Sequence, residues 1–193
     1  MLQRALLSTW LLFGSALTAA AQTPTSGKIQ IVERGIYRAE TLKKVEQPST
    51  TGLINTVENV RLIVSTTSIV GQVGVRFGLR YIVPGSNSEV PLKLVIAFPP
   101  PGLRNSQTEQ VFYLSEQMLT IPAGVTQYWE YHFEHEWEIV AGFWYFQFWH
   151  QNQKLGEQRF CVQELIRRSL ALGLTSECGG GSLGSISTSR SKS

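Results

Sequence analysis

Aspartate is absent from this 193-residue chain, so all 14 of its acidic residues are glutamates. The absence excludes a Ser-His-Asp triad and the aspartate-rich loops that bind calcium. Glutamate can replace aspartate in a triad, but the nucleophilic serine then needs a strained turn, and the chain has no G-x-S-x-G motif. We therefore expect a protein that is not an enzyme and that requires no cofactor.

The chain also has little net charge. Its formal charge is +3 at pH 7, and removal of Arg4 with an N-terminal signal leaves +2. A charge this small gives no strong electrostatic attraction to nucleic acid or to an anionic membrane surface. We expect neither of these as a partner.

Only one long hydrophobic run is present, and it lies at the N-terminus. Arg4 precedes an apolar stretch from Ala5 to Leu17, which is followed by Ala19-Ala20-Ala21. This order is typical of a secretory signal cleaved after Ala21; the alternatives are an uncleaved anchor and a buried helix. No cysteine stands directly after the cleavage site, which disfavours a lipid anchor there, and no later run is long enough to span a membrane. The sequence predicts export to the periplasm or the extracellular space.

Cysteine is scarce, with only Cys161 and Cys178. An oxidising compartment permits a disulfide between them, and closing so short a loop is worth roughly 3 kcal/mol in the chain-entropy model. Because Cys178 lies in a Gly/Ser-rich tail, the alternative is a pair of free or partner-linked thiols. The sequence leaves both outcomes open.

Alternation of apolar and polar residues is the main pattern in the rest of the chain. Every second residue from Val73 to Val83 is apolar, and Pro84-Gly85 ends the run, which predicts a strand with its odd-numbered residues in the core. Further strands are expected at residues 28–40, 57–65, 90–98 and 109–121. The spacing is typical of an all-β sandwich.

A single domain with two tails is expected. Residues 22–28 form a polar linker, and the sandwich occupies residues 29–163. Residues 164–175 have the apolar spacing of a short helix, whereas residues 176–193 are rich in Gly and Ser and are expected to be disordered.

All three histidines lie in the aromatic stretch from Tyr128 to His150. Read as a strand, its first part has an aromatic face (Trp129, Tyr131, Phe133, His135, Trp137) and a mostly charged face (Tyr128, Glu130, His132, Glu134, Glu136). This is the pattern of a half-buried antiparallel strand, and no ligand is needed to explain it.

A metal site is the alternative interpretation of the same stretch. His132 and His135 point to opposite faces of a strand, but His132 with Glu130 or Glu134 remains a candidate set of zinc or copper ligands. We favour a solvated His132 and a hydrogen-bonded His135 at the margin of the core. An acid–base role for Glu134, Glu136 or Glu138 is disfavoured because no nucleophile accompanies these residues.

The last two predicted strands form a hairpin. Trp144, Phe146 and Phe148 alternate inward, and a three-residue loop at Gln151–Gln153 pairs Trp144 with Phe160. Asn152 or Gln153 is expected to take the left-handed conformation. A two-residue loop is disfavoured because it places core residues opposite surface residues.

The outer face of this hairpin is the candidate binding surface. Register places Trp149 opposite Leu155 and Tyr145 opposite Arg159, which we expect to stack on Tyr145. Exposed aromatics beside arginine are typical of protein-binding surfaces, although residues 165–174 could instead fold back and cover them. The loop at residues 99–106 is a second candidate, but a stiff crossover explains its prolines better.

A family resemblance rests on four segments: Gly35-Ile36-Tyr37, Gly74 to Val83, Trp137 to Trp149 and Lys154 to Phe160. Through them the chain resembles the bacterial domain-of-unknown-function family numbered 3859 over residues 33–163. Members usually have proline where this chain has Ala141, a difference that loosens the turn. The resemblance implies a single exported domain and carries over no catalytic residue. The closing hairpin also resembles that of bacterial immunoglobulin-like modules, which favours an immunoglobulin-like antiparallel β-sandwich.

These patterns together favour a non-catalytic binding or accessory module. We expect it to contact another bacterial envelope protein through Tyr145, Trp149, Leu155 and Arg159. The alternatives are a metal-binding protein that uses His132 with Glu130 or Glu134, and a structural domain that self-associates through an edge strand.

Overall fold

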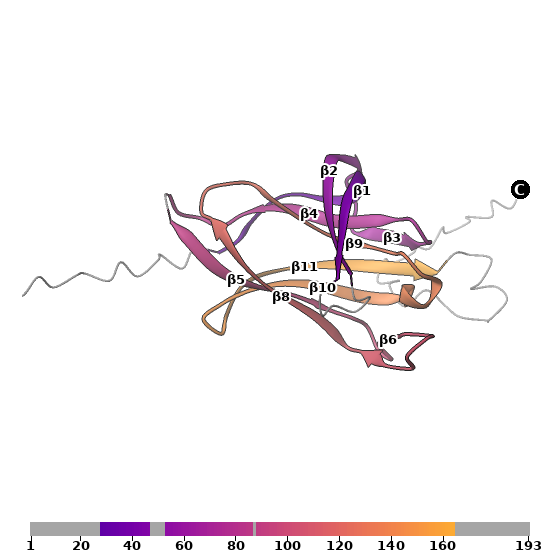
Figure 1. The fold of residues 1–193 in the computed structure, drawn as a ribbon. Helices are drawn as coiled ribbons and strands as arrows, with labels where there is room; N and C mark the ends of the chain where they lie inside the picture. Colours follow the sequence, from indigo (N-terminus) through magenta and orange to yellow (C-terminus); the bar gives the residue numbers. More distant parts are fainter. Residues whose placement is uncertain (1–27, 47–52, 87, 165–193) are drawn as a thin grey trace, which may run out of the picture.

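Two β-sheets packed face to face account for most of residues 28–46, 53–86 and 88–164, the residues that the computed structural model describes. The first sheet has the strand order β2-β1-β4-β9, and its strands are β1 (Gln30–Glu46), β2 (Leu53–Val64), β4 (Arg76–Ile82) and β9 (Gln127–His132). The second sheet has the order β3-β11-β10-β5-β8, and its strands are β3 (Ser68–Gly71), β5 (Glu89–Ala97), β8 (Leu114–Pro122), β10 (Gly142–His150) and β11 (Gln153–Glu164). In Figure 1, β4 of the first sheet lies above β10 and β11 of the second.

Three short elements complete the fold: β6 (Leu103–Arg104), β7 (Val111–Phe112) and the 3₁₀ turn η1 (Glu136–Glu138). The all-β sandwich predicted from the alternation is confirmed. Strand β3 was not predicted, because four residues give too short a pattern to recognise. It pairs in parallel with β11, whereas the other strand pairs of the described residues are antiparallel.

Aromatic side chains fill the space between the sheets. Phe77 of β4 is fully buried, and its ring centroid lies 5.7 Å from that of Phe146 on β10 and 5.4 Å from that of Phe160 on β11. Both pairs meet edge to face, a geometry worth about 0.5–1.5 kcal/mol per pair beyond the burial of apolar area. The predicted core positions Leu79 and Tyr81 are also buried.

The start of β4 was predicted too early. Val73 is 41% exposed, and the strand begins at Arg76. The preceding residues form a turn in which the Val75 N–H donates to the Gln72 carbonyl and Gly74 takes a φ of 92°. Alternation continues through a turn of this kind only by chance, so Val73 was wrongly assigned to the core.

The strand predicted to run to Trp137 ends at His132. Its face assignments hold as far as Phe133, which is fully buried, and then fail because the chain bends into η1. His135 is exposed and its ring stacks on Trp137 at 5.8 Å, so its expected position at the core margin was wrong.

The register of the last hairpin is confirmed, but its loop is not. Trp144 pairs with Phe160 and Tyr145 with Arg159. The loop has two residues, Gln151 and Asn152, with φ values of 47° and 64°, and a bulge beside Phe148 absorbs the extra residue.

This bulge corrects the predicted position of Leu155. Trp149 pairs with Lys154, not with Leu155. The extra residue shifts the alternation, so that Leu155 turns inward and is only 8% exposed. Leu155 therefore belongs to the core and not to the outer face.

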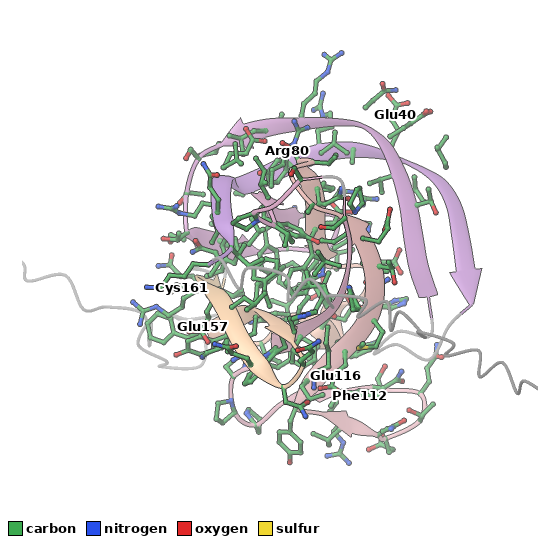
Figure 2. The ribbon with its side chains drawn as sticks, turned by 90° about the vertical axis from the view of Figure 1, so that its left-hand side faces the viewer. Glu40, Arg80, Phe112, Glu116, Glu157 and Cys161 are labelled. Atoms are coloured by element: carbon green, nitrogen blue, oxygen red, sulfur yellow. The ribbon has the colours of Figure 1, made fainter. Side chains whose placement is uncertain are left out.

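The β1–β2 hairpin covers part of the outer face of the first sheet. Three irregularities interrupt its register, and Figure 2 shows the two strands curving together around one side of the molecule. Arg76, which points outward from β4, donates to the Thr41 hydroxyl at 2.6 Å and is only 7% exposed. Arg80 donates to the Val60 carbonyl at 2.9 Å.

Several predictions fall outside the described residues: the signal peptide with its cleavage after Ala21, the linker except Lys28, the helix at 164–175 except Glu164, and the tail at 176–193. Glu164 itself ends β11. Within the described ranges, no helix is long and apolar enough to cross a membrane.

Candidate binding face on the five-stranded sheet

The outer face of the second sheet brings together most of the predicted binding residues. We use "outer face" for the side chains of β11, β10, β5 and β8 that point away from the sandwich: Phe143, Tyr145, Gln147, Trp149, Lys93, Val95, Ala97, Leu114, Glu116, Met118, Lys154, Glu157 and Arg159. Register sorts them into rows, and two of these rows are Arg159–Tyr145–Ala97–Leu114 and Lys154–Trp149–Lys93–Met118. Each row carries one large aromatic side chain.

Trp149 lies between two cations. The Nζ atoms of Lys93 and Lys154 are 5.9 Å and 6.0 Å from its ring, within the range of cation–π attraction. Its indole N–H donates to Oε1 of Gln147 at 3.1 Å. The ring is thus fixed in orientation while it remains partly exposed.

Two ion pairs neutralise the charged side chains around Trp149. Lys93 Nζ lies 3.2 Å from Glu116 Oε1, and Lys154 Nζ lies 3.0 Å from Glu157 Oε2, which also accepts from Gln147 at 3.1 Å. Glu157 and Glu116 are both labelled in Figure 2. These exposed pairs add little stability, but they order the side chains around Trp149.

Arg159 stacks on a different ring from the one predicted. Its guanidinium carbon lies 4.4 Å from the ring centroid of Phe143, so the expected stacking on Tyr145 was wrong. Although Arg159 pairs with Tyr145 across the strands, its long side chain reaches the ring one row further along the face. Tyr145 remains half-buried and Arg159 exposed.

Exposed apolar side chains at the β8 edge extend this surface. Leu114 is 48% exposed and Met118 is 67% exposed, and Tyr113 just before the strand is 65% exposed. The sequence predicts a strand at residues 109–121 but contains no motif that marks these residues as functional. The alternation was visible, whereas the position of the strand at an edge was not.

The structure does not assemble the predicted metal ligands. Glu130 forms an ion pair with Arg76 and accepts a hydrogen bond from the Tyr128 hydroxyl. His132 lies beside Glu134, with 3.6 Å between Nδ1 and Oε1. Across the described ranges, no group of three or more His, Cys, Asp or Glu side chains is arranged to hold a metal ion.

Glu138 is the most perturbed acidic residue of the aromatic stretch. It is fully buried, and one carboxylate oxygen accepts the Glu134 backbone N–H at 2.9 Å. Burial is the main cause that raises its pKa to about 7, and the nearby charge of Glu134 adds to the effect. A carboxyl group without exposed surface cannot reach a substrate in this conformation, so its chemistry concerns the stability of the fold.

Two further predictions concern residues beside this face. Cys161 is disulfide-bonded, while the only other cysteine of the chain, Cys178, lies outside the described residues, so the identity of its partner stays a prediction. The proline-rich loop leads into β6, where Leu103 is fully buried, which agrees with a packed crossover.

Comparison with solved structures identifies the class of fold. The chain is similar to the crystal structure of the immunoglobulin-like protein PA1606 from Pseudomonas aeruginosa, with 22% identity and a TM-score of 0.51. The match covers 72% of this chain and 99% of that chain, so the sandwich described above is an immunoglobulin-like β-sandwich.

The chain belongs to the family described as "Domain of unknown function (DUF3859)", whose profile matches residues 25–162. No curated protein matches the sequence. The family resemblance seen in the sequence is therefore confirmed.

Proposed function

We propose that this protein is a non-catalytic binding module of the bacterial envelope, which contacts another envelope protein through the outer face of its five-stranded sheet. The proposal rests on two aromatic side chains of the second sheet, Tyr145 and Trp149, which keep exposed surface among ordered charges. The first sheet also exposes apolar side chains, such as Leu42 and Ile63, but these are aliphatic, whereas aromatic residues are the typical anchors of protein interfaces.

The chemistry of the face indicates what kind of partner fits it. Arg159 forms no ion pair within the described part of the chain, so its charge is available to a carboxylate. The row that runs from Arg159 through Tyr145 ends at the exposed Leu114. A protein that presents an apolar side chain beside a carboxylate complements this row.

Capture of the tagged protein from the envelope fraction tests the proposal. We expect Tyr145→Ala/Trp149→Ala to lose a partner that the wild-type protein retains, because aromatic anchors dominate the energy of such interfaces. Arg159→Glu should weaken the same association by roughly tenfold, since it opposes a carboxylate with another carboxylate. Quantitative pull-down and circular dichroism measure binding and folding.

Matched controls lie on the first sheet. Leu42 and Ile63 are 58% and 56% exposed, so Leu42→Ala/Ile63→Ala removes comparable apolar surface, and Arg38→Glu reverses an exposed charge elsewhere. Both controls should retain the partner. The proposal fails if the controls lose the partner as readily, or if Tyr145→Ala/Trp149→Ala unfolds the domain.

A further inference from the structure

We propose that β8 is a self-association edge, along which two copies of this chain pair in antiparallel orientation about a two-fold axis at Met118. Joined in this way, two five-stranded sheets become one continuous ten-stranded sheet, and the two outer faces lie side by side. The inference does not rest on the envelope partner proposed above, although the two surfaces share Leu114.

The β8 edge lacks the usual barriers to strand pairing. Among the described residues β8 pairs only with β5, and all nine of its residues stay in register without a bulge. Its proline, Pro122, stands at the last position, and its one charged residue, Glu116, is paired with Lys93. Long, regular and partly apolar edges are the ones that accept another strand. The opposite edge of the same sheet, β3, has only four residues.

The free backbone groups of β8 can be assigned from its end contacts. The Phe98 N–H donates to the Tyr113 carbonyl, and the Ala123 N–H donates to the Ser88 carbonyl, each at 2.9 Å. Odd-numbered residues therefore direct their backbone groups toward β5, and because the direction alternates, even-numbered residues direct theirs outward. The backbone groups that point to the open edge belong to Leu114, Glu116, Met118 and Thr120, together with the Pro122 carbonyl.

An axis at Met118 matches side chains of the same kind. Met118 then faces Met118 of the second copy, Leu114 faces Pro122, and Glu116 faces Thr120. An axis at Glu116 sets two carboxylates against each other, and an axis at Gln117 sets Glu116 against Met118. The axis at Met118 avoids both conflicts and covers the exposed side chains of Leu114 and Met118.

A charge swap at Met118 tests the axis directly. Met118→Glu and Met118→Lys each place two like charges opposite one another, so each variant alone should raise the dimer Kd by roughly tenfold or more. An equimolar mixture of the two should restore the dimer, because Glu then faces Lys. Sedimentation velocity of the purified protein over a concentration series measures the dissociation constant, and Met118→Leu is the matched variant expected to keep it.

Cross-linking gives a second, independent readout. Residues in a hydrogen-bonded antiparallel pair lie about 5.5 Å apart at Cα, within the range of a disulfide. Met118→Cys should therefore cross-link to its own copy on oxidation, as mapped by mass spectrometry. Leu114→Cys should not, because it faces Pro122 of the second copy.

The outcomes separate this inference from the proposed function. A wild-type protein that stays monomeric throughout the series, or a mixture of charge variants that stays monomeric, overturns the self-pairing. Both measurements use the purified protein without any envelope component, so their failure leaves the capture experiment unaffected.

Discussion

At the scale of single residues, Glu138 differs most from its neighbours in the aromatic stretch. Period-two alternation groups it with the outward-facing Glu134 and Glu136, yet it is fully buried. The reason is the bend after Phe133, which ends the strand and lets the Glu138 carboxylate accept the Glu134 N–H. A pattern with a period of two cannot show where a strand stops, so the burial of Glu138 could not be predicted from the alternation.

The raised pKa of Glu138 predicts that the protein loses stability as the pH rises. Because the folded protein holds this proton more tightly than the unfolded chain, the stabilisation is complete below about pH 4.5 and is lost as the pH rises through about 7. Over that pH window, the free energy of unfolding falls by about 3 kcal/mol. We expect Glu138→Gln, which keeps the acceptor for Glu134, to unfold with a flatter pH dependence between pH 5 and pH 8.

Chemical denaturation at several pH values measures this difference. Glu136→Gln is the matched control, since Glu136 is exposed two residues away and its replacement should leave the pH dependence as in the wild type. Equal slopes for the wild type and Glu138→Gln would contradict the role given to Glu138.

At the scale of elements, the β10–β11 hairpin shows what alternation predicts and what it misses. The pairing of Trp144 with Phe160 follows from the apolar pattern, because a slip of one residue exposes the entire core face. The bulge was not predictable in this way. The bulge lets a two-residue turn connect the strands while Trp144 still pairs with Phe160 and Leu155 points inward. Without a bulge, the same apolar pattern requires a longer loop, which is why a three-residue loop was predicted.

The turn of this hairpin can be improved. Gln151 and Asn152 both have positive φ, a conformation that costs a residue such as Gln about 1 kcal/mol and that Asn-Gly adopts readily. Gln151→Asn/Asn152→Gly should therefore raise the Tm by about 3–5 °C. Differential scanning calorimetry tests this, with Gln153→Asn, which lies within β11, as a control that brings no gain. A lower Tm for the double variant would show that the turn is not of this type.

At the scale of the whole molecule, strand order decides which surfaces are free, and strand order is not local in the sequence. The alternation at residues 109–121 predicted a strand, but only the order β3-β11-β10-β5-β8 makes it an edge. Likewise, the coverage of Arg76 depends on its contact with Thr41, 35 residues earlier in the chain. Tyr145, Trp149 and Arg159 lie on the face predicted for them because that face follows from one hairpin, although the expected pairing of Trp149 and stacking of Arg159 were wrong.

We propose that the outer face of the five-stranded sheet is the surface that contacts a partner. Photo-cross-linking in intact cells tests it most directly, with a photoreactive amino acid at Tyr145 or Trp149 and, as controls, at Leu42 or Ile63. We expect one discrete protein adduct from the first two positions and none from the controls. Adducts from the controls alone, or from none of the four positions, would contradict it.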